Sequence, residues 1–177
     1  RDQLTDAADV VVVDDVALPD AARAGSAQPM RAPAGGLLLV YFGYTSCPDV
    51  CPTTLSDISV ALEGLPTDLA ERVRVAMVTV DPERDTDEVV VGYLAHFFDD
   101  GIPLRTDDPS ALQRATDAFG VQWEVADHEA GEAYDVSHTA MTYVVDDRGI
   151  VAVEWPFGFE TDSMTNDLST LLRKEST

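Results

Sequence analysis

The sequence predicts an α/β protein with a central mixed β-sheet flanked by helices. An apolar run at 37–42 and a run dense in β-branched residues at 73–80 have the length and composition of buried strands. A helical pattern follows each run, and strands that are joined by crossover helices form a parallel sheet. Later in the chain, residues 139–145 and 150–155 bracket the turn-forming segment 146–149, which predicts an antiparallel hairpin on the same sheet.

The chain before residue 37 carries weaker signals. Residues 1–9 are polar, and we expect a loose lead-in there. The apolar runs 10–13 and 16–18 flank two aspartates, a pattern that predicts an extra N-terminal hairpin or edge strand. Residues 21–36 are rich in Ala, Gly, Ser and Pro, which favours a loop with room for one short strand.

Capping residues and apolar periodicity place the first two helices. Apolar residues recur at helical spacing after Cys51 and predict a helix that ends near residues 64–66, where Gly and Pro occur. Thr86 or Asp87 is in position to cap a second helix that runs through residues 89–97.

The last third of the chain completes the fold. Residues 101–104 predict a short strand, and Asp108 followed by Pro109 is a strong helix start, with a capping side chain and Pro at the first helical position. Residues 127–135 are polar and predict a mobile loop, and 163–172 predict a closing helix. This order of elements is typical of a thioredoxin-like fold, and we expect residues 1–177 to form a single domain because neither a linker nor an internal repeat is visible.

The chain is strongly acidic. It has 33 acidic and 11 basic residues among 177, for a formal net charge of −22. Such a surface repels phosphate backbones and anionic membrane surfaces, so we expect no nucleic-acid partner. The charge is spread along the chain, which favours general adaptation to high salt over one acidic site. The apolar runs are far shorter than the ~18 residues that a membrane span needs.

The two cysteines stand in the stretch around which the predicted site is organised. Cys47 and Cys51 follow the strand 37–42 and precede the first helix. Residues four apart at the start of a helix lie on one face, with Cβ atoms about 5–6 Å apart. Two sulfurs at such a short distance can chelate a soft ion such as Cu(I), or they can oxidise to a disulfide. The positive end of the helix is expected to lower the pKa of these thiols.

A third ligand is available in His138. This residue directly precedes the strand predicted at 139–145, so the sheet can bring it to the cysteines at the carboxyl ends of the strands. Two thiolates and one imidazole suit Cu(I), and they can hold Cu(II) with a further ligand. His96, beside Phe97 on a helix, and His128, in an acidic loop, are interpreted as structural or solvated residues.

Three motifs resemble the Sco/SenC family of thioredoxin-fold copper chaperones for cytochrome c oxidase assembly. They are Phe-Gly-Tyr-Thr-Ser-Cys-Pro-Asp-Val-Cys-Pro at 42–52, Thr-Val-Asp-Pro-Glu-Arg-Asp-Thr at 79–86, and Ser-His-Thr at 137–139 before a strand and an Asp-Asp-Arg-Gly turn. They occur in family order and span most of the chain from residue 37 onward.

The resemblance implies a function. It implies that Cys47, Cys51 and His138 bind copper, as Cu(I) or Cu(II), and that the protein delivers it to the binuclear site of cytochrome c oxidase subunit II, acts on the thiols of that subunit, or does both. Another copper chaperone or a thioredoxin-like reductant is a further expected partner. The family also implies that the protein works at the extracytoplasmic face of the cell membrane, attached by a membrane anchor. We further expect a monomer.

Asp81 is a candidate for supporting the site. It follows the carboxyl end of the strand 73–80, as the cysteines follow 37–42. In one interpretation it orients a ligand or a neighbour of a ligand. In the other it caps a turn before the second helix, together with Pro82.

Two other classes of function remain open. The first is an enzyme, either a thiol-disulfide oxidoreductase or a peroxiredoxin-like peroxidase without a stable metal. A dithiol reductase more typically has Cys-x-x-Cys spacing and a Pro where this chain has His138, which favours metal binding here. The second is an inert disulfide between Cys47 and Cys51, but so short a loop contributes little stability to a domain of this size.

Overall fold

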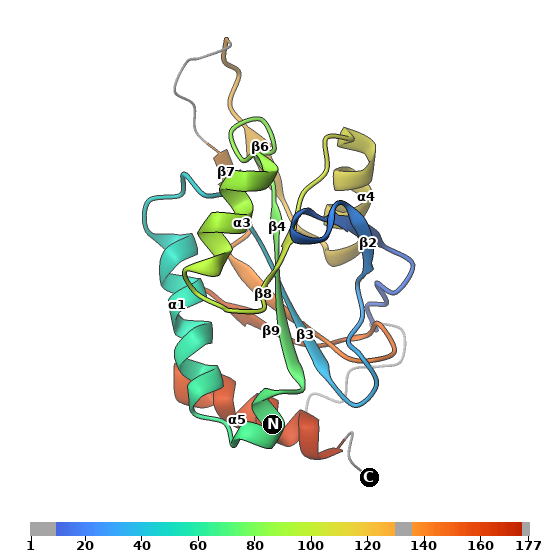
Figure 1. The fold of residues 1–177 in the computed structure, drawn as a ribbon, viewed down its shortest axis with the longest axis vertical. Helices are drawn as coiled ribbons and strands as arrows, with labels where there is room; N and C mark the ends of the chain where they lie inside the picture. Colours follow the sequence, from blue (N-terminus) through green and yellow to red (C-terminus); the bar gives the residue numbers. More distant parts are fainter. Residues whose placement is uncertain (1–9, 130–135, 175–177) are drawn as a thin grey trace.

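The computed structural model describes residues 10–129 and 136–174. Within them, seven strands form one mixed sheet in the order β2-β1-β5-β4-β3-β8-β9 (Figure 1). In chain order these strands are β1 (Ala17–Asp20), β2 (Ser26–Pro29), β3 (Leu37–Gly43), β4 (Val73–Thr79), β5 (Ile102–Leu104), β8 (Met141–Val145) and β9 (Val151–Pro156). β3, β4 and β5 are parallel, β8 pairs antiparallel with β3, and β9 pairs antiparallel with β8. The predicted central mixed sheet is confirmed.

Helices cover both faces of the sheet (Figure 1). In the described part of the chain they are α1 (Val50–Glu63), α2 (Thr67–Ala70), α3 (Asp87–Ala95), α4 (Pro109–Phe119), α5 (Thr161–Lys174) and the short 3-10 helix η2 (Ala21–Arg23). The predicted caps are confirmed, because Thr86 accepts a hydrogen bond from Val89 N and Asp108 accepts one from Ser110 N. None of these helices is both long enough and apolar enough to cross a bilayer.

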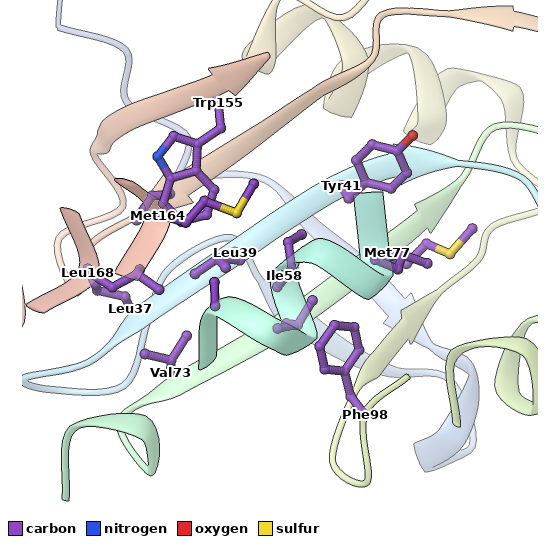
Figure 2. Packing of buried hydrophobic residues seen from close by; sticks show 14 of the residues in the cluster. Leu37, Leu39, Tyr41, Ile58, Val73, Met77, Phe98, Trp155, Met164 and Leu168 are labelled. Carbon is purple, nitrogen blue, oxygen red and sulfur yellow. The ribbon is translucent and has the colours of Figure 1, made fainter. Parts of the chain in front are cut away.

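Strand β3 is the centre of the core. It is buried along its whole length, and its side chains alternate between two apolar clusters. Leu39 and Tyr41 enter the cluster under α1 and α5, which Figure 2 shows, whereas Val40 and Phe42 enter the cluster under α4. This alternation directs Tyr41 to the face of the sheet where α1, and therefore Cys51, is packed.

The N-terminal hairpin exists, but the sequence analysis placed it wrongly. Its two strands are β1 and β2, at the edge of the sheet. The second strand, β2, lies in the segment 21–36, for which the sequence predicted a loop with room for one short strand. Residues 10–13 make only a bridge between Val12 and Ile150, because their backbone bonds the turn that joins β8 to β9. The lead-in predicted at residues 1–9 lies outside the described residues.

A second, two-stranded sheet was not predicted. Strand β6 (Trp123–Val125) pairs antiparallel with β7 (Val136–His138), and Trp123 lies opposite His138. The strand predicted at 139–145 begins two residues late, at Met141, because β7 precedes it. Residues 130–135 of the predicted mobile loop lie outside the described residues. The small sheet matters for function because His138 is the last residue of β7.

Candidate metal centre

The two cysteines lie in the connection between β3 and α1. Cys51 is in the first turn of α1 and has no exposed surface, whereas Cys47 is in the preceding loop and is 8% exposed. Both are free thiols. Asp49 occupies the N-cap position of α1 without a side-chain capping bond, and Cys51 N instead donates to Cys47 Sγ at 3.3 Å. The sulfur of Cys47 is therefore held at the N-terminal end of the helix.

His138 reaches the cysteines from the end of β7. Its Nε2 lies 3.5 Å from Cys51 Sγ, and the ligand atoms of Cys47, Cys51 and His138 all lie within 4.8 Å of one another. The other ring nitrogen, Nδ1, lies 3.2 Å from the carbonyl oxygen of Thr139. With Nδ1–H donating to that carbonyl, the lone pair of Nε2 faces the sulfurs. The predicted meeting of these three residues is confirmed.

The donor set fits a soft metal ion. Metal–ligand bonds of about 2.0–2.3 Å, as in Cys and His sites, place ligand atoms up to about 4.6 Å apart. The three atoms here are nearly at that spacing before any ion binds. Thiolate ligands suit soft ions such as Cu(I), and an imidazole extends the set to Cu(II). The geometry can therefore hold one copper ion after a small contraction.

Burial decides the charge state of two ligands in the metal-free protein. Burial first, and the hydrogen bond with Cys47 second, raise the pKa of the Cys51 thiol to about 12. The expectation that the helix N-terminus lowers this pKa is therefore wrong for Cys51, because desolvation outweighs the helix dipole. Burial also lowers the pKa of His138, so the imidazole is neutral at neutral pH and no proton competes for Nε2.

Two tyrosines that the sequence analysis missed surround the ligands. The hydroxyl of Tyr41 donates to Cys51 Sγ at 3.4 Å, and the rings of Tyr41 and Tyr44 stand edge-on to His138 with centroids 6.1 and 5.6 Å away. Gly43 lies between them, and a Cβ there would be 2.8 Å from the Tyr41 ring and 3.0 Å from Cys51 Sγ. The glycine thus lets the strand pass close to the sulfur. Tyr41 is recognisable in the sequence only through its alternation with neighbours in β3.

Asp81 is linked to His138 only indirectly, through Arg84 and Tyr44. It is 1% exposed, and its carboxylate accepts a hydrogen bond from Arg84 Nε at 2.6 Å. The Arg84 guanidinium lies 5.9 Å from the centre of the Tyr44 ring, which in turn contacts His138. The backbone carbonyl of Asp81 also accepts from Asp85 N, so it closes the turn before α3. That Asp81 orients a ligand stays a prediction.

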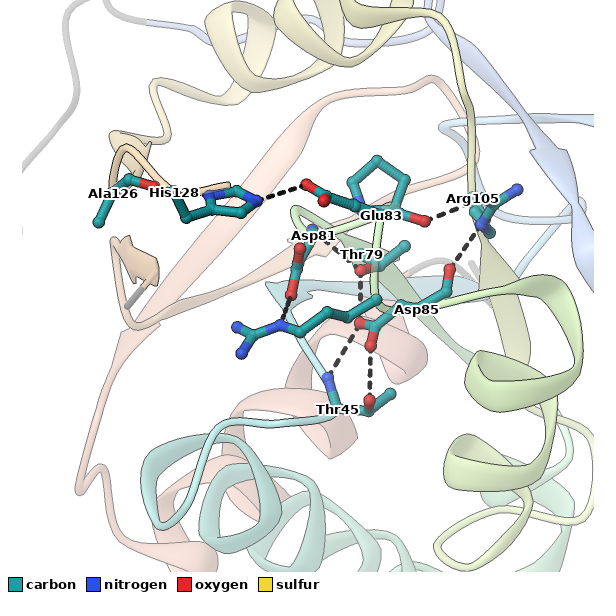
Figure 3. A network of polar contacts seen from close by, with 10 residues as sticks. Thr45, Thr79, Asp81, Glu83, Asp85, Arg105, Ala126 and His128 are labelled. Carbon is teal, nitrogen blue, oxygen red and sulfur yellow. Dashed lines mark hydrogen bonds and ion pairs between the residues drawn. The ribbon is translucent and has the colours of Figure 1, made fainter. Parts of the chain in front are cut away.

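Asp85, in the same motif, makes the more direct contact. It is fully buried, and its carboxylate bonds the backbone N and the hydroxyl of Thr45, in the loop that leads to Cys47 (Figure 3). The sequence analysis quoted this motif but selected Asp81. No signal in a single sequence says which of its two aspartates turns toward the cysteine loop.

The other two histidines lie apart from the three ligand atoms. His96 is exposed and caps the C-terminal end of α3. His128 Nε2 lies 2.8 Å from Glu83 Oε2, and its Nδ1 lies 2.8 Å from the carbonyl oxygen of Ala126. The hydrogen bond to Ala126, followed by the contact with Glu83, raises the pKa of His128. The structure thus gives both a local structural setting.

A cavity of about 290 Å³ opens beside the ligands. Tyr44, Cys47, Pro48, Val136, His138 and Ala140 contribute to its lining. Cys47 and His138 line this cavity, whereas Cys51 is fully buried. A partner that approaches the site therefore meets Cys47 and His138 first.

Comparisons with known proteins agree with this site and fold. The SCO1/SenC family model matches residues 22–173. A SCO2-like protein of Rickettsia prowazekii is 38% identical over 116 residues, which are 65% of this chain and 56% of that protein. The chain thus spans little more than half the length of that relative.

Two solved structures are similar over most of the chain. The solution structure of apo Sco1 from Thermus thermophilus is 35% identical, covers 92% of each chain and has a TM-score of 0.79. The structure of Bradyrhizobium japonicum ScoI with copper bound is 31% identical, covers 88% of this chain and 96% of the other, and has a TM-score of 0.74. The likeness confirms the predicted thioredoxin-like fold.

Proposed function

Because the chain belongs to the SCO1/SenC family, as its motifs predicted, we propose that it is a copper metallochaperone. Copper, as Cu(I) or Cu(II), is its cargo, and Cys47, Cys51 and His138 are the ligands. The observation that carries the proposal is the spacing of these three donors, all within 4.8 Å. A relative that is 31% identical has a structure with copper bound, which supports the choice of metal.

Loading of the site is coupled to proton release. At neutral pH the Cys51 thiol is protonated, because its pKa is about 12. Copper must displace that proton, since the thiolate is the form that binds metal. His138 is already neutral and gives its Nε2 lone pair without losing a proton. Affinity for Cu(I) therefore rises with pH across the neutral range.

Release of the cargo is proposed to occur by ligand exchange at the cavity. Cys47 and His138 line that cavity, so a thiolate or imidazole of an acceptor can replace them while Cys51 still holds the ion. Cys51 then regains a proton as the copper leaves. The order of exchange follows from the difference in burial between the two cysteines.

The acceptor and the setting are proposed from the family. The acceptor is the binuclear copper site of cytochrome c oxidase subunit II, and another copper chaperone or a thioredoxin-like reductant precedes that step. The protein works as a monomer with residues 1–177 as one domain, at the extracytoplasmic face of the membrane to which it is anchored. The net charge of −22 argues against nucleic acid as a partner.

A second candidate function uses the same cysteines. The two free thiols lie close enough to form a disulfide, so the pair can reduce oxidised cysteines of subunit II. In that reaction Cys47 and Cys51 become a disulfide, and the two electrons and two protons go to the acceptor disulfide. The raised pKa of Cys51 disfavours it as the attacking thiolate at neutral pH. The peroxidase alternative gains no specific support from the site.

Mixing the copper-loaded protein with the soluble domain of subunit II separates the two candidates. With a reduced, copper-free acceptor we expect most of the copper to move to it, as measured by metal analysis after separation. An acceptor whose copper-binding cysteines are replaced by serine is the control and should take none. If the copper stays in place while copper-free protein reduces an oxidised acceptor, the dithiol function replaces metal delivery.

A further inference from the structure

The turn after β4 lies against the loop that carries Cys47. β3 and β4 are parallel neighbours, with Gly43 opposite Thr79, so both strands end at the same edge of the sheet. Val80 N donates to the carbonyl oxygen of Gly43 at 2.9 Å and continues the pairing past the strands. Figure 3 shows the result, with side chains from the β4 turn pointing toward Thr45. The two connections are thus packed directly on each other.

The Asp85 carboxylate joins these two connections. It has no exposed surface and accepts three hydrogen bonds, from Thr45 N at 3.0 Å, Thr45 Oγ1 at 2.5 Å and Thr79 Oγ1 at 2.7 Å. A buried carboxylate is costly unless such bonds satisfy it, and bonds to a charged acceptor are the stronger ones. The contact is therefore a rigid one.

Arg105 fixes the turn from the other side. Its Nε donates to the carbonyl oxygen of Asp85 at 2.5 Å, and its Nη2 donates to that of Pro82 at 2.9 Å. Asp107 pairs with the same guanidinium at 2.7 Å. Arg105 thus holds the backbone of Asp85 in place independently of the bonds that the Asp85 carboxylate makes to Thr45.

Thr45 transmits this constraint to the metal ligand. It lies two residues before Cys47, inside the turn that Cys47 N closes by donating to the carbonyl oxygen of Tyr44 at 3.3 Å. We propose that Asp85 is a positioning residue, which holds the cysteine loop so that Cys47 Sγ stays at ligand distance from Cys51 and His138. This proposal deepens the proposed function and rests on it for the identity of the metal.

The same contact is expected to favour the dithiol over the disulfide. A disulfide requires the two sulfurs to approach to about 2.05 Å, with a defined dihedral angle. The three bonds of Asp85 are made around the loop in its reduced form. Loosening them therefore weakens metal binding and makes oxidation of the cysteines easier, two effects that a general loss of stability does not produce together.

Asp85→Asn is the principal variant, and Asp146→Asn is its matched control. An asparagine at 85 keeps the size but turns an NH₂ group toward donors. Asp146 is also buried, at 4% exposure, and also accepts backbone bonds, from Arg148 N and Ile150 N. It follows Val145, which pairs with Leu38 at the opposite end of β3 from the cysteines. Both variants lose stability, but only the first touches the loop.

Two readouts test the proposal. One is the equilibrium constant for oxidation of the cysteine pair by oxidised glutathione, which receives the two electrons and protons. We expect it to rise about tenfold in Asp85→Asn, equivalent to about 30 mV for this two-electron couple. The other is Cu(I) affinity against a chromophoric chelator, which we expect to fall at least tenfold. Asp146→Asn should match the wild type in both.

Thr45 supplies a second pair of variants, which decides the question if Asp85→Asn does not fold. Thr45→Val removes the hydroxyl and should shift both readouts in the same directions by a smaller factor. Thr45→Ser keeps the hydroxyl and should restore wild-type values. The proposal is overturned if Asp85→Asn and Thr45→Val both match the wild type, or if Asp146→Asn shifts the readouts equally.

Failure of the proposed function would look different. If the wild type binds no copper, the metal assignment fails, but the glutathione equilibrium still tests whether Asp85 controls the cysteine pair. If the wild type binds copper and no variant departs from it, the positioning role alone fails.

Discussion

Replacement of Cys51 by serine is expected to lower Cu(I) affinity at least a thousandfold, on the order of 4 kcal/mol. The Cys51 sulfur lies 3.5 Å from His138 Nε2, and the residue has no exposed surface, so water cannot easily replace it as a ligand. A serine hydroxyl is a hard, weakly acidic donor and does not replace a thiolate toward Cu(I). Anaerobic competition with a chromophoric Cu(I) chelator measures the loss.

The control for this variant is Ile58→Val, which also changes a fully buried side chain of α1. It removes one methylene, costs about 0.5–1.5 kcal/mol of stability and leaves the ligands in place. Thermal unfolding of both variants shows whether the fold persists. If Cys51→Ser keeps wild-type Cu(I) affinity while Ile58→Val behaves as expected, Cys51 is not a ligand.

Replacement of His138 by alanine is expected to lower Cu(II) affinity on the order of a hundredfold or more, about 2.7 kcal/mol. The effect on Cu(I) should be smaller, because two thiolates remain and Cu(I) prefers them, whereas imidazole is a major ligand type for Cu(II). The fold should persist, since His138 is at the end of a short two-stranded sheet and is partly exposed. Titration followed by the visible absorption of the Cu(II) protein measures the change.

His96→Ala and His128→Ala are matched controls for His138→Ala. Each removes an imidazole elsewhere in the described structure, and neither side chain is among the three ligand atoms that lie together. Both should retain Cu(II) affinity. An unchanged Cu(II) titration of His138→Ala would remove this residue from the site and leave a plain dithiol protein.

The core of the fold was predictable because its signals are local. The runs that became β3 and β4 are dominated by apolar residues, and nearly all of their side chains are buried, on both faces of the sheet. Asp108 and Pro109 fixed the start of α4, because a cap and a first-position proline act on the adjacent backbone alone. Such elements do not depend on what packs against them.

The edges of the fold were less predictable because their pairing depends on tertiary contacts. β2 lies in a segment rich in Ala, Gly, Ser and Pro, and it exists because β1 pairs with it along four residues. The valines at 10–13 have strong strand propensity but form a single bridge, to Ile150. β6 and β7 are three residues each, too short for a periodic pattern.

The sequence predicted the three ligands of the site but not the residues that surround them. Cys47 and Cys51 stand out by spacing, and His138 stands out because it lies just before a strand. The contact of Tyr41 with Cys51, and the choice of Asp85 over Asp81 against the loop, depend on side-chain directions that a sequence does not specify. The raised pKa of Cys51 was missed for the same reason, since burial is a property of the whole fold.

The most direct test of the account is an anaerobic Cu(I) titration of the wild-type protein in its reduced and its disulfide-oxidised forms. The dithiol and one imidazole make a single site, and oxidation removes both thiolate ligands at once. The account predicts one tightly bound copper per chain in the reduced protein and none in the oxidised protein. Equal loading of the two forms would contradict it, because the cysteines would then not be the ligands.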